Sequence, residues 1–161
     1  MLISKNINDS INEMISIELT AVKQYMAIGA RFKEMGYDNI GNHFLMESSE
    51  EQNHALKIIN YLIRVGAEIK FLGDKNFKQE FNNAEEMIET ALKMETDYYK
   101  FQNDLMNKVK EAKDNLTENF LTWFLENQVE EINELQNLLT KMKKLGEERL
   151  FMLDQFYSKP Q

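Results

Sequence analysis

Acidic side chains interrupt four otherwise apolar helical stripes, and this pattern restricts the possible folds more than any other feature of the chain. The clearest stripe alternates spacings of three and four, as one face of a helix does: Leu121, Phe124, Gln128, Glu131, Leu135, Leu138, Met142 and Leu145. Earlier segments place Glu18, Glu51 with His54, and Glu95 in the same kind of stripe. A buried carboxylate is costly unless it is paired or binds a metal. One such group from each of four helices therefore indicates a shared cation.

Periodicity and helix-end signals predict an all-α chain. Gly36, Gly66 and Gly146 each follow a periodic segment, as glycines that end helices do. Asn83 and Asn115 each precede a glutamate by three residues, which is typical of a helix N-cap. The expected helices cover residues 6–35, 39–65, 84–112, 115–145 and, as a short fifth helix, 147–157.

The lengths of the connections predict a four-helix bundle. Short turns join helices one and two, and helices three and four, so each pair should form an antiparallel hairpin. The long link at 66–83 can carry the chain back along the bundle between the two hairpins. We therefore expect one domain over residues 1–161, with the bundle at about 6–145.

The same arrangement predicts which acidic positions meet. An antiparallel hairpin brings residues that are equally distant from the turn to the same level. Glu18 should therefore face Glu51 and His54, and Glu95 should face Gln128 and Glu131. Each hairpin gathers its polar positions near mid-helix.

The expected ligands are rich in oxygen and include one imidazole, which suits iron or manganese better than structural zinc. Glu51 and His54 form a Glu-x-x-His pair on one helix face, and bundle cores hold pairs of metal ions with such ligands. Tyr25 lies two turns beyond Glu18, so its phenol could hydrogen-bond to a ligand or supply an electron. A solvated charged face is the simpler interpretation of any one of these motifs. Their conjunction on four helices favours the metal site.

Composition excludes several other classes of function. The formal net charge of −8 argues against a nucleic-acid partner. The chain has no cysteine, which excludes thiolate and iron–sulfur sites. Residues 1–12 do not resemble a signal peptide, and no apolar run has the length of a membrane span. We expect a cytoplasmic protein without a membrane partner.

Over almost its whole length the chain resembles the bacterial non-haem ferritins. The resemblance includes Glu18 seven residues before Tyr25, the Glu50-Glu51-x-x-His54 run, and the segment from Trp123 to Gln-x-x-Glu at 128–131. It implies a ferritin-like bundle in which Glu18, Glu51 and His54 hold a first iron. Glu51 would bridge to a second iron held by Glu95, with Gln128 and Glu131 beside it, and Tyr25 would be a redox-active phenol.

The resemblance also implies a third iron site just inside a shell. Its ligands would be Glu50, Glu130 and Glu131, whereas a further glutamate of the family is replaced by Asn127. This departure bears on the affinity of the third site.

The family implies an iron-storage ferroxidase that oxidises Fe(II) with O2 or H2O2. Twenty-four copies would form a hollow shell that holds ferric mineral. Alternatives are a haem-bearing bacterioferritin, a rubrerythrin-type peroxidase and a non-catalytic structural cage. Gln52 replaces the methionine of bacterioferritins, and Gln128 with Glu131 replaces a second Glu-x-x-His, so no haem is expected. A non-catalytic cage would lose the ligands that this chain retains.

Overall fold

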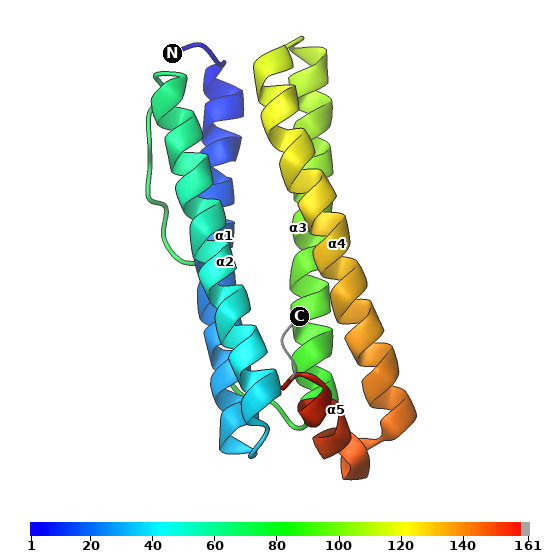
Figure 1. The fold of residues 1–161 in the computed structure, drawn as a ribbon. Helices are drawn as coiled ribbons and strands as arrows, with labels where there is room; N and C mark the ends of the chain where they lie inside the picture. The colour runs from blue at the N-terminus through cyan, green and yellow to red at the C-terminus, as the bar shows by residue number, and fades with distance from the viewer. Residues whose placement is uncertain (159–161) are drawn as a thin grey trace.

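The computed structural model describes residues 1–158, and these residues form two antiparallel helical hairpins that lie side by side (Figure 1). Helices α1 (Lys5–Glu34) and α2 (Asp38–Arg64) form the first hairpin, and α3 (Ala84–Glu111) and α4 (Asn115–Leu145) form the second. A 3-10 turn, η1 (Glu147–Arg149), leads into the short helix α5 (Leu150–Phe156). The structure confirms the all-α bundle with a long crossover, and the four long helices begin and end within one residue of their expected limits. None of the helices among residues 1–158 is long and apolar enough to cross a membrane.

The ends of the helices follow the expected capping chemistry at α3 but not at α4. The Asn83 side chain accepts a hydrogen bond from the backbone N–H of Glu86 at 2.8 Å. The expected cap at Asn115 is wrong, because Asn115 is already helical. Asp114 is the cap instead, with non-helical backbone angles and a side chain that accepts from the N–H of Thr117 at 3.1 Å.

Two glycines let α1 and α2 approach closely near their turn. A Cβ atom added to Gly29 would lie 2.9 Å from the carbonyl oxygen of Gly41, and one added to Gly41 would lie 2.8 Å from that of Gly29. Both distances are too short for a side chain, so this contact requires glycine on both helices.

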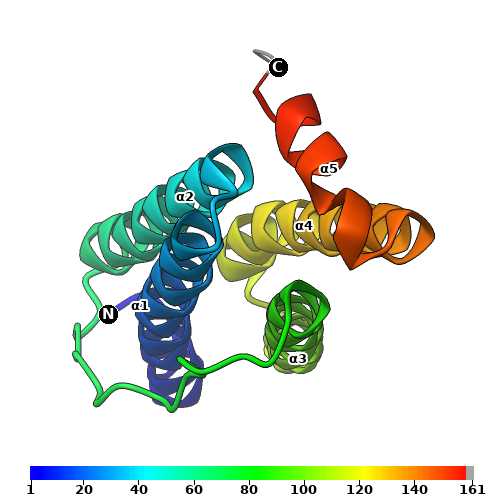
Figure 2. The same cartoon turned by 90° about the horizontal axis from the view of Figure 1, so that it is seen from below.

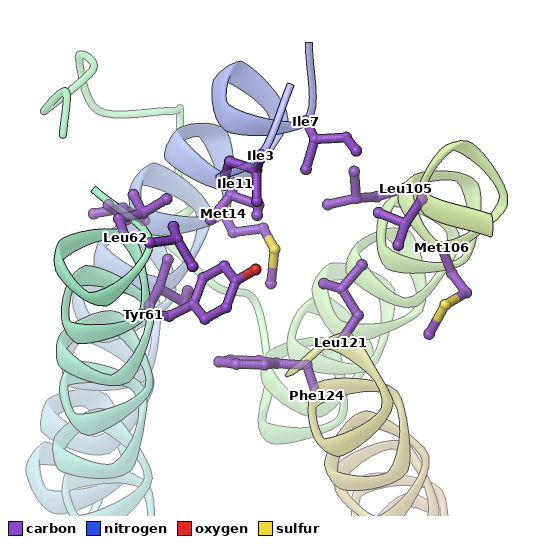
Figure 3. Packing of buried hydrophobic residues seen from close by; sticks show 14 of the residues in the cluster. Ile3, Ile7, Ile11, Met14, Tyr61, Leu62, Leu105, Met106, Leu121 and Phe124 are labelled. Carbon is purple, nitrogen blue, oxygen red and sulfur yellow. The ribbon is translucent and has the colours of Figure 1, made fainter. Parts of the chain in front are cut away.

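Two apolar clusters fill the bundle, one toward each end. Figure 3 shows the cluster that α1, α2, α3 and α4 build near the N-terminus, which includes Ile11, Tyr61, Leu105 and Phe124. The second cluster, near the α1–α2 turn, includes Phe32. The buried polar residues of the acidic stripes lie between these clusters, so the candidate site is enclosed by hydrophobic core along the bundle axis.

A ladder of polar side chains on α1 holds the crossover. Asn12, Ser16, Thr20 and Gln24 recur every fourth residue, and each hydrogen-bonds to the backbone of residues 68–78. The Gln24 side chain both donates to the carbonyl of Lys78 and accepts from its N–H, at 2.8 Å in each case. The crossover forms no helix or strand, so these side chains supply hydrogen-bond partners to its backbone N–H and carbonyl groups. The crossover therefore follows α1 from one end of the bundle toward the other (Figures 1 and 2).

Helix α5 packs against α2 and α4 and supplies a cap to α2 (Figure 2). One carboxylate oxygen of Asp154 accepts hydrogen bonds from the N–H groups of Asn39 and Ile40, at 3.0 and 2.9 Å. These N–H groups lie in the first turn of α2, where they have no partner within the helix. The cap fixes the short helix beside the start of α2.

Replacing Asn12 with alanine should loosen the crossover. The change leaves the carbonyl of Glu68 and the N–H of Lys70 without their side-chain partner, a loss of roughly 1–3 kcal/mol of unfolding free energy. We expect a lower thermal midpoint and faster tryptic cleavage in the crossover, which carries several lysines. The exposed Asn6 on the same helix gives the matched control, Asn6→Ala. Equal cleavage rates in the two variants would contradict this role of Asn12.

Candidate metal centre

The first group of potential ligands joins the two helices of the first hairpin. Glu18 from α1 and Glu51 and His54 from α2 each offer a ligand atom within 4.8 Å of the others. Nδ1 of His54 lies 3.6 Å from Oε2 of Glu18 and 3.5 Å from Oε2 of Glu51. All three residues are buried. The pairing expected across the first hairpin is therefore present.

A second group shares one of these glutamates and connects α2 to α4. Glu47, Glu51 and Glu131 also offer ligand atoms within 4.8 Å of one another. Because Glu51 belongs to both groups, two cations could lie on either side of its carboxylate. Sequence reasoning missed Glu47, although it lies four residues before Glu51 and so shares its helix face.

The second hairpin joins Glu95 to Gln128. The amide nitrogen of Gln128 donates to the backbone carbonyl of Glu95 at 2.9 Å and also contacts its Oε2. Gln102, which is fully buried, donates to the side-chain oxygen of Gln128 at 3.4 Å. Gln128 therefore acts on Glu95 as a hydrogen-bond donor, and Gln102 orients Gln128.

Two tyrosines align the hairpins with each other. The hydroxyl of Tyr25 on α1 donates to Oε1 of Glu95 on α3 at 2.5 Å. In the opposite direction, the hydroxyl of Tyr98 on α3 donates to Oε1 of Glu18 on α1 at 2.8 Å. These crossed bonds place the carboxylates of α1 and α3 at the same level. Tyr98 was not expected from sequence, although it lies three residues after Glu95 on the same face.

Three carboxylate oxygens in the centre are buried yet have no hydrogen-bond partner among residues 1–158: Oε2 of Glu18, Oε1 of Glu51 and Oε2 of Glu131. Buried polar atoms normally have a partner, so these three oxygens require a proton or a cation. Carboxylate oxygens with one imidazole nitrogen suit Fe(II) and similar divalent ions. The donor set therefore fits the iron that the sequence predicts.

Burial makes these carboxyls hard to ionise when no cation is present. Burial raises the pKa of Glu18 to about 8, although the Tyr98 hydroxyl opposes the shift. Burial, followed by the charges of Glu51 and Glu95, raises the pKa of Glu131 to about 11. Burial also raises the pKa of Glu51 well above its usual range, and the charge of Glu18 adds to this effect. A divalent cation would restore the ionised form by replacing the protons.

Aromatic rings fix the orientation of His54. The imidazole packs edge-to-face against Trp123, with ring centroids 5.5 Å apart, and against Phe124 at 6.1 Å. Lys57 lies over the Trp123 ring, 3.5 Å from its centroid. Since Trp123 is the only tryptophan of the chain, its fluorescence can report on this position.

The residues expected to form a third iron site do not form a ligand group like the two described above. Glu50 and Glu130 are exposed, and neither belongs to the two ligand groups found within residues 1–158. Asn127 donates from Nδ2 to Oε1 of Glu131 at 2.9 Å. A third iron site at Glu50, Glu130 and Glu131 stays a prediction.

The chain is similar to known proteins in both sequence and structure. A family model described as a ferritin-like domain matches residues 8–145. Bacterial non-heme ferritins are similar: that of Staphylococcus aureus is 29% identical over 147 residues, covering 91% of this chain and 89% of the relative. That of Staphylococcus saprophyticus is 31% identical over 150 residues, covering 91% and 88%. An open pore ferritin from the archaeon Archaeoglobus fulgidus has a similar structure, with a TM-score of 0.94, 25% identity and coverage of 99% and 98%.

The cation-free protein should lose stability as the pH rises from about 5 to 8. The pKa of Glu18 is raised from 4.5 to about 8, so the folded state binds more protons than the unfolded state in this range. Each such carboxyl lowers the unfolding free energy by roughly 1.4 kcal/mol per pH unit. Thermal unfolding in the presence of a chelator measures the slope.

Two comparisons isolate the contribution of Glu18. Glu18→Gln should make the fall in stability less steep, and Glu51 and Glu131 should account for the rest. Glu126→Gln, at an exposed position on α4, should leave the pH profile unchanged. Saturating Co(II) should also remove the fall, because the cation replaces the protons. A slope that is the same in Glu18→Gln and in the wild type would show that Glu18 is not the titrating group.

Proposed function

The chain belongs to the ferritin-like family and has the family's general role in iron storage; on that premise, we propose that it oxidises Fe(II) at the centre between its four helices. The proposal is supported by two ligand groups that share Glu51. Together they contain three buried carboxylate oxygens that have no hydrogen-bond partner among residues 1–158. Fe(II) is the substrate of this centre, and the ferric product is the stored material.

The two Fe(II) ions would occupy unequal positions. Glu18, Glu51 and His54 would hold the first ion with two carboxylates and one imidazole. Glu51 and Glu131 face the second position, and Glu95 lies beside it with Gln128. The second position has oxygen donors in place of the imidazole, which suits the harder Fe(III) product.

Oxidation would use the two ions together. Each Fe(II) gives up one electron, so a filled centre supplies the two electrons that reduce O2 to peroxide, or H2O2 to water. The raised pKa values of Glu18 and Glu131 mean that these carboxyls release protons as Fe(II) binds. The enclosing apolar clusters limit access of water to the reacting ions.

Tyr25 is suited to give an electron to the oxidant in addition to those from the two Fe(II) ions. Its hydroxyl donates to Oε1 of Glu95 at 2.5 Å, so the phenol proton can pass to that carboxylate when the ring is oxidised. The buried environment raises the pKa of Tyr25 well above its usual value, which keeps the phenol protonated until that step.

Storage requires a container, and we propose the hollow shell of twenty-four copies that the family implies. The similarity to a solved ferritin over 99% of this chain supports homo-oligomeric assembly. The docked position of α5, fixed by Asp154, presents exposed Phe151, Met152 and Phe156, which could pack against neighbouring copies.

Removing ligands of the first position should abolish rapid oxidation. Glu18→Ala and His54→Ala should each lower the initial rate of Fe(II) oxidation by more than the roughly 10–100-fold that loss of an outer partner costs. Stopped-flow absorbance of the ferric product measures this rate, and Glu126→Ala is the control. Unchanged rates in both ligand variants would refute the di-iron assignment.

The assembled particle should contain twenty-four chains of 19.0 kDa. Light scattering coupled to size exclusion gives the mass directly. Because Phe156 is exposed in the single chain, Phe156→Glu should weaken assembly if α5 packs between copies. A wild-type mass of one or two chains would contradict the shell.

A further inference from the structure

A pocket between α2 and α4 opens beside the second ligand group. Its volume is about 190 Å³, and its walls include Tyr25 from α1, Glu47 from α2, Glu131 and Glu134 from α4, and Tyr157 just after α5. Neither Glu18 nor His54 lines it. The pocket therefore reaches the side of the centre that carries Glu47 and Glu131.

Two carboxylates of the pocket wall, Glu47 and Glu131, form a group with the buried Glu51 that could hold a cation. Glu47, Glu51 and Glu131 have ligand atoms within 4.8 Å of one another. Glu51 is 1% exposed, and its Oε1 is buried without a hydrogen-bond partner in the described chain, as is Oε2 of Glu131. Three acidic groups at this separation repel one another unless protons or a cation lie between them.

Two neighbouring side chains lie beside these ligands. Asn127 occupies Oε1 of Glu131 with an N–H donor, so the other oxygen, Oε2, is left for a ligand. Nε2 of His43 lies 3.9 Å from Oε1 of Glu47, and the His43 ring packs against Phe44 and Tyr157. Glu131 and Glu47 thus each have a polar side chain beside one carboxylate oxygen.

We propose that Glu47, Glu51 and Glu131 together bind a divalent cation beside the pocket. This makes Glu47 a metal ligand of the centre. The inference rests on the proposed function, because Glu51 also serves the first iron position. It assigns the second Fe(II) a carboxylate from α2 that lies one turn before Glu51.

Further titratable side chains line the pocket beyond this ligand group. Glu134 follows Glu131 by one turn of α4 and lines the same pocket, so it is the next carboxylate outward. Lys141 is a basic residue of the lining, and the acidic groups outnumber it. Because Glu47 and Glu131 line this pocket and neither Glu18 nor His54 does, it borders the second position and not the first.

Calorimetric titration of the metal-free assembled protein with Co(II) tests the proposal. The wild type should bind two ions tightly per chain. Glu47→Gln should keep one tightly bound ion and lower the affinity for the other by more than the roughly 10–100-fold that loss of an outer partner costs. Glu134→Gln removes the same charge from the same pocket without removing a proposed ligand, so it should lower the affinity for that ion less. Glu47→Asp keeps the charge but shortens the side chain, so its affinity for this ion should lie between those of Glu47→Gln and the wild type.

Trp123 fluorescence identifies which ion is affected. Co(II) at the Glu18, Glu51 and His54 position should quench Trp123, because its ring packs against His54. Glu47→Gln should retain this quenching, whereas His54→Ala should lose it.

The outcomes separate this proposal from the di-iron proposal. If Glu47→Gln titrates like the wild type while His54→Ala loses one ion, Glu47 is not a ligand, and the di-iron centre stands without it. If Glu47→Gln loses both ions or the Trp123 quenching, the two positions are not separate in the way proposed, and the inference is also wrong. Unchanged titrations in both variants would overturn both proposals.

Discussion

Several carboxylates are buried at one level of the helical bundle, and the packing of all four long helices has to accommodate them. Glu18, Glu51 and Glu95 are each 1% exposed, between two apolar clusters that exclude water. Such groups destabilise a fold unless each oxygen finds a partner. Here tyrosine and glutamine donors satisfy some oxygens, whereas Oε2 of Glu18, Oε1 of Glu51 and Oε2 of Glu131 have no partner in the described chain. A cation would complete the coordination of these carboxyl oxygens.

The donors also determine how the helices lie. The crossed bonds from Tyr25 to Glu95 and from Tyr98 to Glu18 join α1 to α3, so they fix the level at which the two hairpins meet. The α1–α2 hairpin is set independently by its glycine contact, and the crossover is held by the polar ladder of α1. The stable scaffold thus holds the acids close together in the absence of metal, which reduces the reorganisation needed when Fe(II) binds.

Much of the fold and the position of the site could be predicted from the sequence. Helical periodicity and glycine positions gave the limits of the long helices, because a 3.6-residue repeat and the φ > 0 of a terminal glycine are local properties. Hairpin geometry predicted that Glu18 faces His54 and that Glu95 faces Gln128. Glu47 was missed, although it shares a helix face with Glu51, because only the packing of α2 against α4 brings it close to Glu131. The cap at Asp114 was missed because adjacent Asp and Asn are equally good caps, and the turn geometry chooses between them.

Anomalous diffraction at the iron edge, from crystals soaked in Fe(II) without oxygen, would locate the ions bound at this centre. We expect two iron peaks per chain on opposite sides of the Glu51 carboxylate. One peak should lie among Glu18, Glu51 and His54, and the other should contact Glu47 and Glu131. An iron-free centre, or iron only at the exposed Glu50 and Glu130, would contradict it.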